Sequence, residues 1–228
     1  MCLRPKQGFN EFEWNLRYPG PVHVADDLIP ENGELRRFSG QSSMSLEGPY
    51  VEPGDYTIEL NTGEKTISAN CKIIPGVYAK NDNDELSKQT KFLLTVRNKL
   101  SEVNSTINSI RKLKSELRKN KIIESDEKNF MLSEIDDIDR ELASTAEIEE
   151  EQSTVDQNSQ GKRFGRVTDG AFFADSYNAR LNGLIDTAGN TESIHTKQSE
   201  LVFENLDTKI NVLINKFKSI SDNYQNSL

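Results

Sequence analysis

The spacing of apolar residues changes near residue 80 of this chain. Before that point, short runs alternate between apolar and polar positions, as in β-strands with one buried face. After it, apolar residues return at every third or fourth position, as in amphipathic helices. The pattern predicts an α+β protein with a small antiparallel β module over residues 1–80 and a helical bundle over residues 81–228.

The β module is predicted to begin with a strand over residues 9–16. Its alternating pattern places Phe12, Trp14 and Leu16 on one buried face. Residues 19–50 contain Gly, Pro, Ser and Asp throughout. They predict a long excursion with one short strand near residues 35–38.

A hairpin is predicted next, with strands over residues 55–60 and 65–74 joined by a turn at residues 61–64. A closed antiparallel sandwich usually has about seven strands. The module is therefore either an incomplete β-sandwich or a small sheet covered by the helices.

The helical half predicts a four-helix antiparallel bundle. The predicted helices run from a cap within residues 81–84 to Asn120, from a cap at Ser125 to Leu142, from residue 169 to 187, and from Thr191 or Ser193 to Tyr224. Because the first and last helices are the longest, we expect them to pack along each other. Residues 146–168 interrupt the pattern and predict a flexible loop, acidic at first and basic later.

The buried residues of this bundle follow from the apolar stripes. They are Leu86, Leu93, Val96, Leu100, Val103, Ile107, Ile110, Leu113 and Leu117; Phe130, Met131, Ile135, Ile138 and Leu142; Phe172 or Phe173, Tyr177, Leu181, Leu184 and Ile185; and Ile194, Leu201, Phe203, Leu206, Ile210, Leu213, Phe217, Ile220 and Tyr224.

Composition restricts the partners. The net charge of −9, from 28 basic and 37 acidic residues, argues against nucleic-acid binding, which needs clustered positive charge. No apolar run reaches the length of a membrane span, and the first residues lack the apolar core of a signal peptide. Cys2 and Cys71 could pair only if the N-terminus lay beside the strand that carries Cys71, so free thiols are favoured.

Several groups resemble binding or catalytic sites, but each has a simpler structural interpretation. His23 and His195 lack further ligands at zinc spacing. Residues 81–85 (Asn81, Asp82, Asn83, Asp84 and Glu85) offer oxygen ligands for Ca²⁺, yet lack the Gly and terminal Glu of an EF-hand loop, which favours helix capping. The acidic residues Asp136, Asp137, Asp139 and Glu141 are expected on the solvated face of their helix.

Three further candidates remain. Trp14, Tyr18, Tyr50 and Tyr56 could form an aromatic platform for a carbohydrate, although strand alternation favours a core role for Trp14. The basic cluster Lys162, Arg163 and Arg166 around Phe164 could hold an anion or an acidic partner, but a solvated loop is favoured. The glycosylation sequon Asn104-Ser105-Thr106 falls within a helix and is discounted. No catalytic, cofactor-binding or metal-binding residue is therefore predicted.

Three segments in order resemble a known family. Residues 10–20, residues 48–56 and the stripe over residues 86–117 are similar to the C-terminal region of bacterial glycosyl hydrolase-like, sialidase-like or sortilin-like BNR-repeat proteins. Asn15 stands where that family more often has Asp. The resemblance covers nearly the whole chain and rests on the order and spacing of the segments.

The resemblance implies an Ig-like or fibronectin type III-like β module and a helical tail behind large β-propeller domains. It also implies that strands preceding residue 9 in the family are missing from this chain, and that any hydrolase site lies in the absent propeller. An extracytoplasmic parent would follow from it.

The leading hypothesis is a non-catalytic accessory module whose partner is a β-propeller domain of the same or a neighbouring polypeptide, or a second copy. The alternatives are a supporting component of a glycoside hydrolase and a standalone helical adaptor.

Overall fold

The computed structural model describes residues 7–24, 30–31, 34–35, 47–75, 83–120, 123–143, 176–189 and 194–226. Within them the fold is α+β, with four helices and two separate two-stranded antiparallel sheets. The predicted fold class is thus confirmed at this level. A complete β-sandwich is not present among the described residues.

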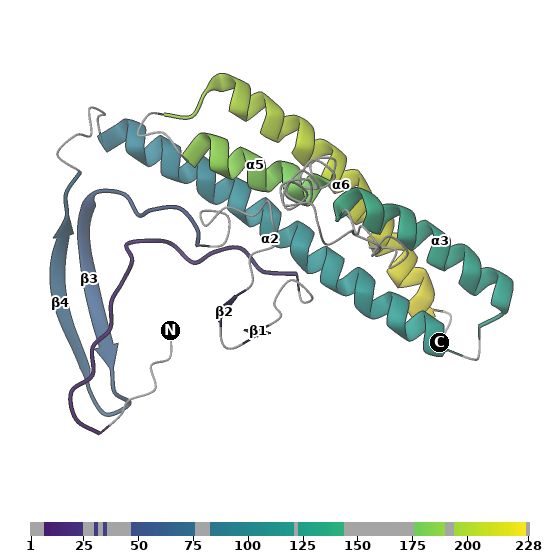
Figure 1. Ribbon diagram of the computed structural model, residues 1–228, viewed down its shortest axis with the longest axis horizontal. Coiled ribbons are helices and arrows are strands. Elements are labelled where there is room, and N and C mark those ends of the chain that lie inside the picture. Colours follow the sequence, from purple (N-terminus) through teal and green to yellow (C-terminus); the bar gives the residue numbers. More distant parts are fainter. Residues whose placement is uncertain are drawn as a thin grey trace, which may run out of the picture.

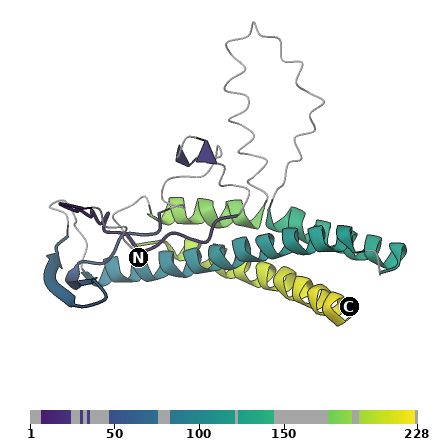
Figure 2. The same cartoon turned by 90° about the horizontal axis from the view of Figure 1, so that it is seen from below.

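The helices are α2 (Asn83–Lys119), α3 (Ser125–Leu142), α5 (Tyr177–Gly189) and α6 (Lys197–Asn226). Helices α3 and α5 run end to end in the same direction, antiparallel to α2, and α6 then returns at an incline across the other three (Figures 1 and 2). The four helices therefore form a bundle of three rods, of which the second is divided into α3 and α5. The expectation that the two longest helices pack along each other holds only in part, because α3 and α5 line most of α2 while α6 crosses it.

The core follows the stripe predicted for α2. Its largest fully buried side chains come from all four helices: Val96, Leu100, Val103, Ile107, Ile110, Leu117, Ile135, Ile138, Leu142, Leu181 and Ile210. Each contributes about 1.5–3 kcal/mol of transfer free energy on burial. This shared core holds the three rods together.

The helix predictions fail at a few positions. Phe130 is 64% exposed, because it precedes the buried Met131 by one residue and so points about 100° away from the core. Ile194 and Leu201 are also exposed, and α6 begins at Lys197, later than predicted. The N-cap position of helix α3 is Glu124, which makes no side-chain capping hydrogen bond, and Ser125 is its first helical residue.

The other helix ends agree more closely with the sequence. Helix α2 begins at Asn83, within the predicted cap region, and ends one residue before Asn120. Helix α5 ends at Gly189, two residues after the predicted end at residue 187, and Ile214 joins the core of α6 although the predicted stripe omitted it. Phe172, Phe173 and the predicted loop over residues 146–168 lie outside the described residues.

The predicted hairpin is confirmed. Strands β3 (Gly54–Asn61) and β4 (Thr66–Ile73) pair antiparallel, with Tyr56 opposite Cys71 and Leu60 opposite Ile67. At the turn the Gly63 N–H donates to Asn61 Oδ1 at 2.8 Å, and Gly63 has a φ of 88° that a glycine adopts readily. A second, very short hairpin joins β1 (Pro30–Glu31) to β2 (Glu34–Leu35), at the start of the short strand predicted near residues 35–38.

The strand predicted over residues 9–16 is wrong. These residues form no ladder, and Phe9, Phe12 and Leu16 are exposed. The extended run ends at Leu16, whose φ of 57° lies in the left-handed region. The only nearby pairing among the described residues is an isolated bridge between Arg17 and Tyr50. Alternation alone does not make a strand when no neighbouring strand supplies hydrogen bonds.

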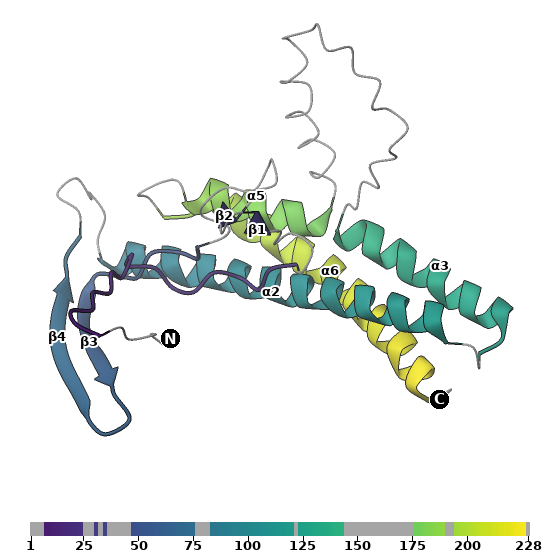
Figure 3. The same cartoon turned by 60° about the horizontal axis from the view of Figure 1, so that its bottom comes forward.

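Residues 21–24 lie along α2 and tie the β module to the bundle (Figures 1 and 3). The Val22 N–H donates to Ser101 Oγ at 3.2 Å, Asn104 Nδ2 donates to the Val22 carbonyl at 2.6 Å, and Asn108 Nδ2 donates to the His23 carbonyl at 3.0 Å. Val24 enters the core. We call residues 21–24 the strap.

Asn104 also connects the strap to α5. Its Oδ1 accepts a hydrogen bond from Asn178 Nδ2 at 2.5 Å, and Asn178 Oδ1 in turn accepts one from Asn182 Nδ2 at 2.8 Å. Asn104 is buried, and both its Nδ2 and its Oδ1 are hydrogen-bonded inside the protein. This explains physically why the sequon is a poor glycosylation site in the folded chain.

Replacing Asn104 should therefore destabilise the fold. Asn104→Ala leaves the Val22 carbonyl and the Asn178 amide without their partner, so we expect the free energy of unfolding to fall by about 1–3 kcal/mol. Urea unfolding followed by circular dichroism measures this. Ser105→Ala, at the exposed neighbouring position of the same helix, is the control. Equal stability of the two variants would contradict a structural role for the amide chain.

Candidate functional site

The β3–β4 hairpin has two chemically distinct faces. Side chains alternate along each strand, and directly opposed residues share a face. One face carries no charged side chain and, apart from the Tyr56 hydroxyl, is apolar: Tyr56, Ile58, Leu60, Ile67, Ala69, Cys71 and Ile73. The other face carries only polar ones: Asp55, Thr57, Glu59, Asn61, Thr66, Ser68, Asn70 and Lys72. We call the first set the apolar hairpin face.

One half of the apolar hairpin face is covered by the N-terminal segment. The Trp14 ring meets the Tyr56 ring edge-on, with the ring centroids 5.7 Å apart, and Trp14 Nε1 donates to the Arg17 carbonyl at 3.2 Å. The Tyr56 hydroxyl donates to the Glu52 carbonyl at 2.7 Å. Burial, followed by the nearby Tyr18, Glu52 and Cys71, raises the pKa of Tyr56.

The other half of this face is open. Ile58, Leu60 and Ile67 are 53%, 48% and 58% exposed, respectively, although alternation places them where a sheet normally meets its core. Cys71 lies at the covered end and is a free thiol, while Cys2 falls outside the described residues. The apolar hairpin face is the clearest candidate for a functional surface.

A tight contact fixes the N-terminal segment beside the hairpin. The Tyr18 N–H donates to the Pro49 carbonyl and the Val51 N–H to the Leu16 carbonyl, both at 2.9 Å. Gly48 has a φ of 60°, and a Cβ there would collide with the Tyr18 carbonyl oxygen. Only glycine fits this crossing.

Arg17 reinforces the same crossing. Its guanidinium donates to the Gly48 carbonyl at 2.9 Å, pairs with Glu47 at 3.3 Å, and lies 3.6 Å from the centroid of the Tyr50 ring. The four aromatic residues considered as a carbohydrate platform therefore do not form one flat surface, because Trp14 meets Tyr56 edge-on and Arg17 covers Tyr50.

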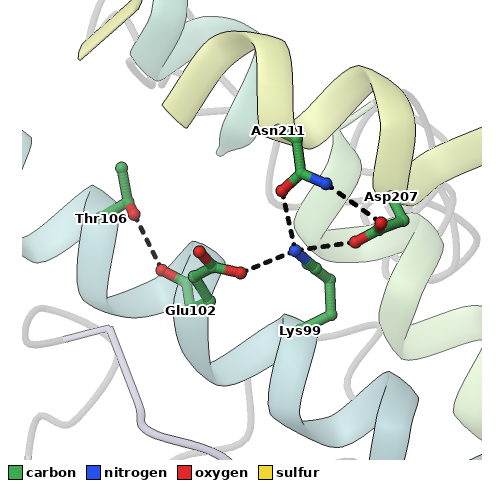
Figure 4. Close-up of polar contacts among 5 residues, drawn as sticks. All are labelled: Lys99, Glu102, Thr106, Asp207 and Asn211. Carbon is green, nitrogen blue, oxygen red and sulfur yellow. Dashed lines mark hydrogen bonds and ion pairs between the residues drawn. The ribbon is translucent and has the colours of Figure 1, made fainter. Parts of the chain in front are cut away.

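Lys99 anchors a polar cluster between α2 and α6 (Figure 4). Its Nζ lies 2.7 Å from both Glu102 Oε2 and Asp207 Oδ1, and donates to Asn211 Oδ1 at 2.9 Å. Burial lowers the pKa of Lys99, but the hydrogen bonds to Asp207 and Glu102 outweigh it and leave the pKa raised. The ammonium is fully engaged, so this cluster joins two helices rather than offering a reactive amine.

A shallow open hollow of about 340 Å³ lies beside this cluster and is lined by Thr95, Asn98, Lys99, Glu102, Phe203 and Asp207. Its charged groups are already paired with one another. The hollow therefore presents no unpaired charged group that would orient a substrate.

A second polar cluster joins α2 to α3, and its position corrects one prediction. Lys114 Nζ lies 2.6 Å from Asp136 Oδ1 and 3.0 Å from Asp139 Oδ2. Asp139 was expected on the solvated face, but only 3% of it is exposed, because Lys114 reaches across from α2 to neutralise it. Glu141 is exposed as expected, and Asp137 is also exposed and pairs with Arg140 at 3.0 Å.

The histidines have structural surroundings. The His195 ring stacks on Phe92 with centroids 4.0 Å apart and its Nε2 lies 2.9 Å from Glu200 Oε1. The His195 N–H donates to Gln89 Oε1, and Gln89 Nε2 donates to the Ala188 carbonyl, so this group closes the α5–α6 connection over α2. His23 contributes its carbonyl to the strap.

Within the described residues, no group of three or more His, Cys, Asp or Glu side chains is placed to hold a metal ion. Asn83 and Asp84 begin α2, while Asn81 and Asp82 lie outside the described residues, as does the basic cluster Lys162, Arg163 and Arg166 with Phe164. No helix in the described part of the chain is both long and apolar enough to cross a membrane. No family model, curated protein or solved structure matches this chain.

The Lys114 cluster gives a test with a defined pH dependence. Lys114→Met leaves the buried Asp139 carboxylate without its partner, so we expect a loss of about 2 kcal/mol, less than for a fully buried pair because Asp136 keeps contact with water. Lys112→Met, at an exposed position on the same helix, is the control.

The direction of the pH effect follows from the raised pKa of Lys114. Burial lowers that pKa, but hydrogen bonds to Asp136 and Asp139 raise it above its ordinary 10.5 overall. The ammonium therefore makes its full contribution to the stability of the fold below pH 10.5. This contribution is lost as the pH rises through the folded-state pKa of Lys114. Urea unfolding at about pH 8 and about pH 11.5 measures the free energy of unfolding of wild type and Lys114→Met. The difference between the two should be smaller at the higher pH. A gap that widens would contradict this assignment.

Proposed function

We propose that this chain is a non-catalytic accessory and interaction module of a larger sialidase-like or sortilin-like β-propeller protein. The observation that carries the proposal is the apolar hairpin face, half of which is open to solvent. The resemblance of residues 10–20, 48–56 and 86–117 to the C-terminal region of such proteins supports the identity of the partner.

The physical argument starts from the instability of the hairpin alone. An isolated two-stranded hairpin is marginal in water, and a stable sheet needs further strands or a packed face. Here the N-terminal segment covers only the end near Tyr56 and leaves Ile58, Leu60 and Ile67 exposed. Contiguous exposed apolar surface on a folded chain commonly marks a site of protein contact.

The shape and chemistry of this face favour a β-rich partner. A flat sheet face packs against another sheet at a separation of about 10 Å, with the side chains of both layers interdigitating. The apolar hairpin face carries no charged side chain, so its partner needs apolar rather than charged residues at the contact. A strand-built domain such as a propeller offers such a layer.

The helical bundle serves as the base of the module. Its core is closed, and the strap fixes the β module to α2 through three hydrogen bonds and Val24. The ammonium groups of Lys99 and Lys114 are committed to contacts between helices. These features favour a binding role over a catalytic one.

The proposal is tested with the purified chain and a propeller domain from a protein of that kind. We expect binding by isothermal titration calorimetry, and a loss of at least about tenfold in affinity for Ile58→Asp, because a carboxylate would be buried without a partner. Val212→Asp, at an exposed position of α6, is the matched control and should bind as wild type does.

Two outcomes would contradict the proposal. One is the absence of binding by wild type. The other is equal affinity of the Ile58→Asp and Val212→Asp variants, which would remove the apolar hairpin face from the contact. Measuring glycoside hydrolysis by the propeller with and without the chain separates docking alone from support of catalysis.

A further inference from the structure

We infer that the outer edge of β4 pairs antiparallel with the same edge of a second copy of this chain, so that two hairpins join into one four-stranded sheet. The contact is made by the backbone edge of the hairpin. The apolar hairpin face stays open in the joined sheet, so the inference goes beyond the proposed function and does not depend on it.

The outer edge of β4 has no strand beside it in the described part of the chain. The sheet holds only β3 and β4, and β4 is the strand farther from the bundle (Figures 1 and 3). Hydrogen-bonded and non-hydrogen-bonded pairs alternate along an antiparallel ladder. Because the Thr62 N–H donates to the Lys65 carbonyl at 2.9 Å, every second residue of β4 from Thr66 onward turns its backbone N–H and C=O away from β3. These residues are Thr66, Ser68, Asn70 and Lys72.

The sequence of β4 does little to block a further strand. Exposed edge strands are normally protected by short length, proline, a bulge or charged side chains. Strand β4 is eight residues long, above the usual length of about five or six, and it contains no proline. Its register against β3 is continuous, and its single charged residue is Lys72. An edge of this kind accepts an extended partner through main-chain hydrogen bonds.

The charge of β4 favours a second copy as that partner. The chain has a net charge of −9, so most contacts between copies bring acidic residues together. Strand β4 has no acidic residue, whereas β3 carries Asp55 and Glu59. A two-fold contact through β4 therefore avoids the repulsion that a contact through β3 would meet.

The register of the pair also keeps the lysines apart. Directly opposed residues of an antiparallel pair lie on the same face, so a two-fold pair that keeps the two faces separate is centred on one residue. The two central registers place either Asn70 or Ala69 on the two-fold axis. Lys72 then lies opposite Ser68 or Thr66 of the second copy, and in neither register opposite the second Lys72.

Joining two hairpins also corrects their low strand number. An isolated two-stranded hairpin is marginal in water, whereas three or more strands with an apolar face are stable. In either register Ile67 of one copy lies beside Ile73 or Cys71 of the other, so the apolar hairpin face continues across the axis. A contact made mainly by backbone groups is smaller than a standard interface. We therefore expect a reversible dimer with a dissociation constant of about 10–300 µM.

Sedimentation velocity of the full chain tests the inference, at about 5–500 µM and under reducing conditions so that Cys71 cannot form a covalent dimer. We expect Asn70→Lys to raise the dissociation constant at least about tenfold, because the introduced lysines face each other directly or diagonally across the axis. Thr57→Lys, directly opposite on β3, is the matched control and should dimerise as wild type does. Both variants remove the same hydrogen bond from Thr57 Oγ1 to Asn70 Oδ1.

A second pair of variants tests the backbone contact itself. Ser68→Pro removes an outward N–H while the ladder to β3 is kept, so we expect it also to raise the dissociation constant at least about tenfold. Glu59→Pro, directly opposite Ser68 on β3, is its control and should dimerise. Unchanged fluorescence of Trp14, the only tryptophan, shows that the hairpin keeps its contact with the N-terminal segment.

Amide hydrogen exchange followed by NMR locates the contact. We expect the protection of the Ser68 and Asn70 amides of wild type to rise with protein concentration, while the Thr57 and Glu59 amides of β3 stay unchanged. A monomer up to about 500 µM overturns the inference. So does a dimer that both Asn70→Lys and Ser68→Pro leave intact, or one without this rise in protection.

Failure of the proposed function has a different signature. Ile58→Asp, which should abolish docking, lies on β3 and should leave the dimer intact. A monomer that binds the propeller domain overturns edge pairing alone, whereas a dimer that binds no propeller domain overturns docking alone.

Discussion

The burial of one stripe of α2 holds the rest of the described structure in place. Residues such as Val96, Leu100, Val103 and Ile107 are fully buried because α3, α5 and α6 surround them. The strap adds Val24 to the same core and so brings the β module to the side of the bundle. Removing this stripe would release the helices and also the segment that leads into the hairpin.

Polar contacts then determine how the elements fit around that stripe. Three amide side chains link the strap, α2 and α5, while Lys99 and Lys114 each join α2 to one further helix. Apolar packing favours compactness but tolerates sliding, whereas hydrogen bonds between fixed partners select one register. The hairpin differs from the closed helical core, because its apolar hairpin face is shielded from solvent at one end only.

The sequence predicted those features that depend on neighbours along the chain. The long stripe of α2 and the β3–β4 hairpin follow from local spacing and turn residues, and both are confirmed. Residues 9–16 were mispredicted because a strand needs a pairing partner that alternation does not reveal. Asp139 was mispredicted because its partner, Lys114, lies on another helix. The sequence pattern predicted one strand of the apolar hairpin face, with Tyr56, Ile58 and Leu60. It could not predict that the face is exposed, because exposure depends on which other elements cover it.

The division of the second rod has a consequence for how this chain can vary. Helix α3 ends and helix α5 begins at nearly the same place along α2 (Figures 1 and 2). The two helix ends that the chain joins are therefore close together, and the entropy cost of closing such a connection grows only slowly with its length. The connection between Leu142 and Tyr177 can therefore change in length while the three rods keep their packing. The connection between α3 and α5 is thus a position where the bundle tolerates changes in chain length.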